Sequence, residues 1–127
     1  RLCEKWGIKS RPLADITPRA DQDVVVDCTG SREGMATAMQ LLRPRGTLVL
    51  KSTVAPGGEA VDLSPLVVDE INLIGSRCGP FKPAIRALAE GHVDVHSMIS
   101  RRVPMGDALE ALRLAASPGV LKVLLTM

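Results

Sequence analysis

The stretch DVVVDCTGSREG, Asp23–Gly34, decides the fold. Three consecutive valines run into an acid, a cysteine, a threonine and a glycine, and Ser31 is then placed to cap a helix. A short strand that is apolar on both faces is typical of buried parallel strands. The stretch therefore predicts a parallel strand whose carboxyl end faces a ligand.

The composition favours layers of sheet and helix. Hydrophobic residues make up 46% of the 127 residues but aromatic residues only 2%, so the core is expected to be aliphatic. The net charge of +2 is small, the basic residues are scattered, and there is no aromatic stacking platform, which argues against nucleic-acid binding. No apolar run approaches the roughly 20 residues of a membrane helix. We therefore expect neither nucleic acid nor a membrane as a partner.

The cysteines and the first residues indicate the cellular setting. Cys3, Cys28 and Cys78 are odd in number and form no CxxC pair, which argues against a disulfide framework and fits a reducing, cytoplasmic location. The chain opens without Met, in what reads as the end of a helix stopped by Gly7. We therefore expect a fragment of a longer protein.

Further elements follow from hydrophobic spacing. A helix capped by Ser31 carries Met35, Ala38, Met39 and Leu42 on one stripe and is expected to end at 44–46. The other expected elements are strands at 24–26, 47–52, 71–76 and 120–127, a weak strand within 8–15, a short amphipathic segment at 62–70, helices at 81–91 and from 105, and extended chain at 92–104. This order predicts a parallel sheet wrapped by helices on both faces.

In such a sheet, ligands bind beyond the carboxyl ends of the strands. The residues that follow the predicted strands are small or polar, as a ligand-facing rim should be: Cys28, Thr29 and Gly30; Lys51, Ser52 and Thr53; Ser76, Arg77, Cys78 and Gly79. Pattern alone supports this interpretation no better than the simpler one, in which loops are polar because they meet water.

The succession of segments resembles the coenzyme-binding half of the medium-chain dehydrogenase/reductase superfamily, the zinc-dependent alcohol dehydrogenases and their relatives. The segments that carry the resemblance are VVVDCTG, LLRPRGTLVLKST, INLIGSRCGPF, AEGHVD, ISRRVPMGDALEAL and VLKVLLTM. The resemblance implies an incomplete, doubly wound parallel sheet of the Rossmann type. Residues 1–127 would be its C-terminal part, without the first strands, the glycine-rich turn and the N-terminal catalytic domain.

The resemblance also implies roles at the strand ends. Cys28, Thr29 and Gly30 would pass beneath the adenosine ribose of NAD or NADP. Lys51, Ser52 and Thr53 would lie along the nicotinamide, with Lys51 either approaching the ribose hydroxyls or pointing to solvent. Ser76, Arg77 and Cys78 would hydrogen-bond the carboxamide through their backbone. Lys122 would lie near the pyrophosphate as a point charge.

The function that the resemblance implies is hydride transfer between a nicotinamide cofactor and an alcohol or carbonyl substrate. No catalytic residue or metal ligand is expected in this chain, so the fragment alone would be inactive, and any zinc would belong to the missing domain. The resemblance further implies a homodimer paired through the edge strand Ile71–Ser76. The alternatives are a zinc-free quinone or enoyl reductase of the same superfamily and a non-enzymatic association module with an empty cleft.

Other motifs have simpler interpretations. His92 and His96 have the i, i+4 spacing of a metal pair, but the residues between them alternate, which favours surface chain. TGSREG matches a dinucleotide-binding glycine motif at only two positions, Gly30 and Gly34, and follows an inner strand. Cys28 and Cys78 are expected to pack as small residues at strand ends.

Overall fold

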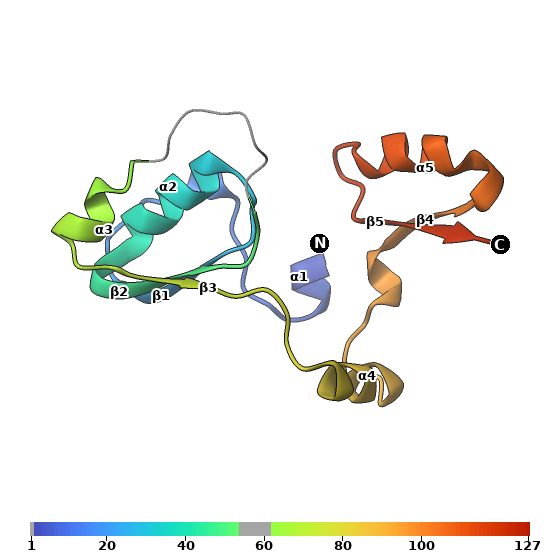
Figure 1. The fold of residues 1–127 in the computed structure, drawn as a ribbon, viewed down its shortest axis with the longest axis horizontal. Helices are drawn as coiled ribbons and strands as arrows, with labels where there is room; N and C mark the ends of the chain where they lie inside the picture. Colours follow the sequence, from blue (N-terminus) through green and yellow to red (C-terminus); the bar gives the residue numbers. More distant parts are fainter. Residues whose placement is uncertain (1, 54–61) are drawn as a thin grey trace. The chain divides into compact units, whose positions relative to one another are not determined.

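The computed structural model describes residues 2–53 and 62–127 (Figure 1). These residues form two compact units. The first, Ser10–Gly79, contains a three-stranded sheet, and the second, made of 2–9 and Pro80–Met127, contains a two-stranded sheet. Both sheets are parallel, which confirms the α/β class.

The three-stranded unit follows the predicted alternation of strand and helix. Its sheet has the order β1-β2-β3, formed by β1 (Gln22–Asp27), β2 (Leu42–Leu50) and β3 (Asn72–Gly75). Helix α2 (Arg32–Leu41) connects β1 to β2, and the short α3 (Ser64–Val68) precedes β3. Within this unit, β1 and β3 are the two edges of the sheet.

The core of this unit lies between the sheet and its helices. Met35, Ala38 and Met39 of α2 are buried at the spacing that the sequence predicted, against Leu48, which has no exposed surface. Leu66 of α3 packs against the same cluster, so both helices cover one face of the sheet. The amphipathic stripe of α2 thus positions the helix over β1 and β2.

The other face of this sheet is apolar and exposed. Val24 and Val26 are 56% and 53% exposed, and Ile74 is 50% exposed. Alternate side chains of a strand point to opposite faces, and here α2 and α3 lie on the same side. The prediction that the valine strand is buried on both faces is therefore wrong for this unit.

Other predicted elements of this unit also need correction. Within 8–15 there is a single 3-10 turn, Leu13–Asp15, and not a strand, because Pro12 offers no N–H and its carbonyl accepts from the N–H of Asp15. Helix α2 stops at Leu41, and β2 begins directly at Leu42, which pairs with Gln22.

In β2, the turn predicted at 44–46 is an irregularity within the strand. Arg45 adopts a left-handed φ of 63°, and its N–H donates to the carbonyl of Asp69 at 2.7 Å. The chain bends there and resumes pairing at Thr47.

The two-stranded unit is built around β4 (Ile99–Pro104) and β5 (Lys122–Thr126), with α5 (Ala108–Ala115) between them in sequence. Ala111 of α5 is buried, whereas Leu109 and Leu112 are exposed. The predicted extended chain at 92–104 is only partly so, because a 3-10 turn, His96–Met98, precedes β4.

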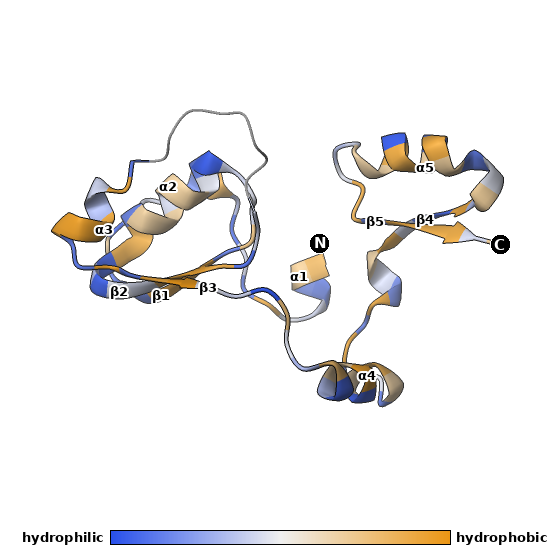
Figure 2. Ribbon diagram, viewed as in Figure 1, coloured by the Kyte–Doolittle hydropathy of each residue, from blue (hydrophilic) through white to orange (hydrophobic). Residues whose placement is uncertain are grey.

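This unit also holds two helices, α1 (Leu2–Lys5) and α4 (Phe81–Ala89). Figure 2 shows that α4 contains both hydrophobic and hydrophilic residues. Its first residue, Phe81, is 79% exposed. Among the described residues, no helix combines the length and the apolar character needed to cross a membrane.

Asp94 fastens the N-terminal helix to the two-stranded unit. Its carboxylate accepts hydrogen bonds from Lys5 Nζ at 2.9 Å, from Trp6 Nε1 at 3.3 Å and from the N–H of Ser97 at 3.0 Å. Hydrogen bonds from the Ser97 hydroxyl, and then from Lys5, hold the pKa of Asp94 below its ordinary value of 3.8. Since the carboxylate is exposed, solvent screens the interaction and its energy is small.

We predict that acid releases Trp6, the only tryptophan of the chain, at a pH below 3.8. The folded-state pKa of Asp94 is lowered, so its stabilising contacts are fully present above 3.8 and are lost as the pH falls through the lowered pKa. Tryptophan emission recorded against pH should show a transition with its midpoint below 3.8, and Asp94→Asn should abolish this transition. A midpoint at or above 3.8 would contradict the assignment.

Candidate functional site: the carboxyl ends of three parallel strands

The three strands of the larger sheet end side by side. Asp27, the last residue of β1, pairs with Leu50 of β2, which in turn pairs with Gly75 of β3. The ladder continues one step further, because the N–H of Lys51 donates to the carbonyl of Asp27 at 2.8 Å and the N–H of Ser76 to that of Leu50 at 2.9 Å.

This register brings together nine of the ten residues that the sequence analysis proposed for cofactor binding. We call the strand-end rim the set of residues Asp27–Gly30, 51–53 and 76–78. In Figure 2 the hydrophobic colour along β3 gives way to a hydrophilic stretch after the strand. The rim is thus a polar border on an apolar sheet.

Lys122, the tenth residue, belongs to the other unit. It begins β5 in the two-stranded unit, where it is exposed and pairs with Ile99. Its proposed role at a pyrophosphate stays a prediction.

Asp27 is a rim residue that was not predicted from the sequence. Only 5% of this residue is exposed. Its Oδ1 accepts from the N–H of Thr29 at 2.9 Å and from the Thr29 hydroxyl at 2.7 Å. A buried carboxylate needs such partners, so the turn after β1 is fixed by them. The sequence feature that could have indicated Asp27 is its position as the single charged residue directly after the apolar run 24–26.

The same network leads into helix α2. The Thr29 hydroxyl oxygen accepts from the N–H of Ser31 at 3.2 Å, and the Ser31 hydroxyl accepts from the N–H of Gly34 at 3.0 Å. Ser31 is therefore the N-cap, as predicted. Strand end, turn and helix start form one hydrogen-bonded unit.

Two glycines allow this turn to be tight. Gly30 has a left-handed φ of 65°, and a Cβ placed there would lie 3.2 Å from the carbonyl oxygen of Thr53. A Cβ at Gly34 would lie 1.9 Å from Thr29 Oγ1. The glycines of TGSREG thus serve close packing between the strand end and the helix.

Lys51 links the ends of β2 and β3. Its ammonium Nζ donates to the carbonyl of Arg77 at 2.9 Å and to the hydroxyl of Ser76 at 3.3 Å. Of the two alternatives expected for this side chain, the ribose hydroxyls or solvent, Lys51 is exposed to solvent, and these contacts hold its positive charge at the end of β3. Its approach to ribose hydroxyls stays a prediction.

The two rim cysteines, Cys28 and Cys78, are free and exposed, and not packed as the sequence analysis expected. Each follows the end of its strand, so its side chain meets solvent.

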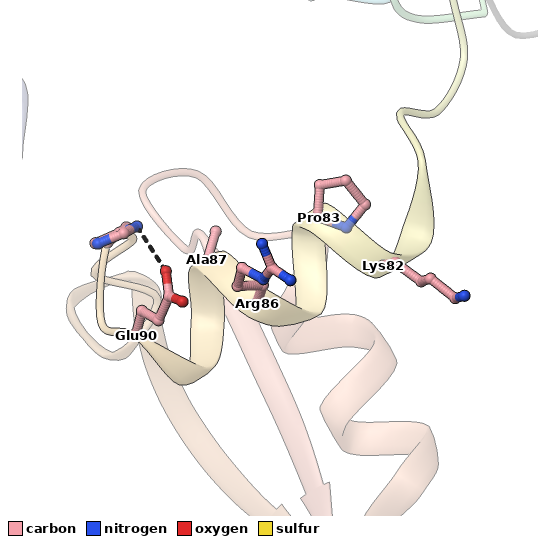
Figure 3. Close-up of a pocket in the computed structure, with 6 residues that line it drawn as sticks. Lys82, Pro83, Arg86, Ala87 and Glu90 are labelled. Atoms are coloured by element: carbon pink, nitrogen blue, oxygen red, sulfur yellow. Dashed lines mark ion pairs between the residues drawn. The ribbon is translucent and has the colours of Figure 1, made fainter.

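A separate surface pocket of about 250 Å³ lies on α4 of the two-stranded unit (Figure 3). Lys82, Arg86 and Glu90 line it, and Glu90 Oε2 lies 3.5 Å from His92 Nδ1. Nearly all of its wall comes from one exposed helix, so we regard it as a solvated helix face. Over residues 2–53 and 62–127, no three His, Cys, Asp or Glu side chains gather in a way that could hold a metal ion.

Parallel strands with a polar rim at their carboxyl ends are consistent with a partial Rossmann-type fold, in which nucleotides bind at that edge of the sheet. Residues 10–94 match the family model described as zinc-binding dehydrogenase. The chain belongs to the zinc-binding dehydrogenase family.

Individual relatives agree with this assignment. Over 108 residues the chain is 32% identical to sorbitol dehydrogenase of Mus musculus, a match that covers 81% of this chain and 29% of that protein. It superimposes on L-idonate 5-dehydrogenase from Escherichia coli with a TM-score of 0.83 and 25% identity, over 99% of this chain and 39% of that chain.

A zinc-binding dehydrogenase from Sinorhizobium meliloti, whose structure was determined bound to NADP, matches with a TM-score of 0.69 and 26% identity over 86% of this chain and 33% of that one. The chain spans about 30% of the length of the curated relatives.

We predict that Gly34→Ala destabilises the protein by about 1–3 kcal/mol, because the new methyl group overlaps the Thr29 side chain and displaces the turn after β1. Gly75→Ala is the matched control, since a Cβ there meets nothing within 4 Å. Urea unfolding followed by circular dichroism measures both. Equal free energies of unfolding for the two variants would show that the turn is loose.

Proposed function

We propose that this chain is the cofactor-orienting part of an NAD(P)-dependent oxidoreductase that transfers hydride between nicotinamide and an alcohol or carbonyl substrate. The observation that carries the proposal is the strand-end rim, in which ten residues at the ends of three parallel strands converge where such folds bind nucleotides. Membership of the zinc-binding dehydrogenase family supports it.

The rim fits a nicotinamide nucleotide by its shape and its chemistry. Gly30 adds no side chain at the turn after β1, and Cys28 and Ser52 are small, so a flat ligand can approach the backbone. Asp27 is buried and its Oδ1 accepts hydrogen bonds from Thr29, so we assign it to fixing the turn and not to contacting the ligand. Lys51 supplies a cationic donor at the middle strand.

When bound, nicotinamide supplies the chemistry by accepting a hydride from the carbinol carbon as the hydroxyl proton leaves, or by the reverse reaction. This chain would bind and orient it. Cys28, Thr29 and Gly30 would support the adenosine ribose, Lys51, Ser52 and Thr53 would lie along the nicotinamide, and the backbone of Ser76, Arg77 and Cys78 would bind the carboxamide. Lys122 would pair with the pyrophosphate.

We assign no catalytic acid, base or metal ligand to this chain and expect the chain alone to be inactive. Polyols are the first substrates to test, because the similar proteins include sorbitol dehydrogenases. A cytoplasmic location is part of the proposal and rests on the three free cysteines.

A homodimer paired through β3 is also part of the proposal. Within the three-stranded sheet, β3 is an edge, and Leu73 and Ile74 on it are 44% and 50% exposed. Unpaired edges with apolar side chains favour pairing with another strand.

Two other functions would use the same fold. A zinc-free quinone or enoyl reductase would bind nicotinamide equally well, and zinc analysis of the natural protein separates it from an alcohol dehydrogenase. A non-enzymatic association module would pair through β3 and bind no nucleotide.

We predict that the natural protein containing this chain binds NADH or NADPH, and that Cys28→Trp weakens binding by about tenfold or more, because an indole at this exposed position obstructs the rim. Calorimetric titration measures both dissociation constants. Val67→Trp is the control, since Val67 is 79% exposed on α3 and outside the rim. Absence of nucleotide binding in the unmodified protein would favour the association module.

A further inference from the structure

Lys51 is a rim cation whose charge is fixed in position by two described contacts of its ammonium. Its N–H continues the ladder from β2 to β1, and its ammonium reaches across to the end of β3. Both hydrogen-bond acceptors on that side, the Arg77 carbonyl and the Ser76 hydroxyl, are neutral. The contacts therefore hold the ammonium in place without cancelling its charge.

The local surroundings add no compensating ion pair. None of the ion pairs formed by described residues includes Lys51. The nearest acid in the ladder, Asp27, uses its Oδ1 to accept from Thr29. An ammonium has three donors, and two are accounted for here, so Lys51 keeps both a donor and a net charge for a ligand.

A fixed positive charge distinguishes the two redox states of a nicotinamide cofactor. The oxidised ring carries a positive charge and the reduced ring carries none, whereas the phosphates and riboses are the same in both. An ammonium near the ring thus repels the oxidised form and leaves the reduced form unaffected.

We propose, on the basis of the function proposed above, that Lys51 is a specificity-determining residue that makes the site bind reduced nicotinamide nucleotide more tightly than oxidised nucleotide. Binding the reduced form more tightly favours oxidation of the alcohol on the protein and speeds release of oxidised nucleotide. The side chain acts through its charge, and its hydrogen bonds to the end of β3 keep that charge in place.

The expected size follows from simple electrostatics. For one unit charge roughly 10 Å from the ring in a partly solvated site, the effect on the ratio of the two dissociation constants is about five- to tenfold. Salt should reduce it, because the site is open to solvent and the Debye length is about 8 Å at physiological ionic strength.

The experiment is calorimetric titration of the natural protein with oxidised and with reduced nucleotide, at low and at high salt. In Lys51→Met the ratio Kd(oxidised)/Kd(reduced) should fall by about five- to tenfold, whereas Lys51→Arg should retain it because the charge remains. Lys82→Met is the matched control, since it removes an exposed lysine from α4 and leaves the rim intact. Lys51→Gln serves as a second neutral variant if Lys51→Met does not fold.

The outcomes separate the two proposals. If both nucleotide forms weaken by the same factor in the neutral variants, Lys51 only fastens the end of β3, and the inference is wrong although the proposed function stands. A ratio in the unmodified protein that does not respond to salt also contradicts the inference. If the unmodified protein binds neither form, the proposed function fails, and the inference fails with it.

Discussion

Parallel, in-register pairing of three strands is the constraint on which the rest of the site depends. It places Asp27, Leu50 and Gly75 on one line, and the ladder bonds made by the N–H groups of Lys51 and Ser76 carry that alignment past the strand ends. Residues that lie more than twenty positions apart in sequence therefore meet at one border. A shift of one residue in either pair would turn every side chain to the other face.

Two side chains of opposite charge, Asp27 and Lys51, stabilise this border through their hydrogen bonds. On one side the buried carboxylate of Asp27 holds Thr29, and through Thr29 and Ser31 it joins the strand end to helix α2. On the other side the ammonium of Lys51 holds the end of β3. The carboxylate is buried and satisfied, so it serves structure, whereas the ammonium is exposed and is available to a ligand.

Much of this could be predicted from sequence, where local patterns decide the outcome. The stripe of Met35, Ala38 and Met39 and the cap at Ser31 correctly predicted α2, because periodicity and capping are local. The strand proposed within 8–15 was wrong, since a strand requires a partner that local sequence does not reveal. Exposure of Val24 and Val26 was missed for the same reason: it depends on which face the helices cover.

The candidate site shows the same division. The positions of the rim residues followed from the strand order, but the contacts of Lys51 and Asp27 did not, because they join residues of different strands or depend on burial. The roles of the nine predicted rim residues toward a cofactor were implied by the family resemblance and stay proposals.

Hydrogen–deuterium exchange of the natural protein, with and without reduced nicotinamide nucleotide, tests the central claim most directly. The account predicts that nucleotide protects backbone amides in the three rim segments, 27–30, 51–53 and 76–78, together, because all three border one ligand. Protection confined to α4, around the pocket lined by Lys82 and Arg86, or the same exchange with and without nucleotide, would contradict it.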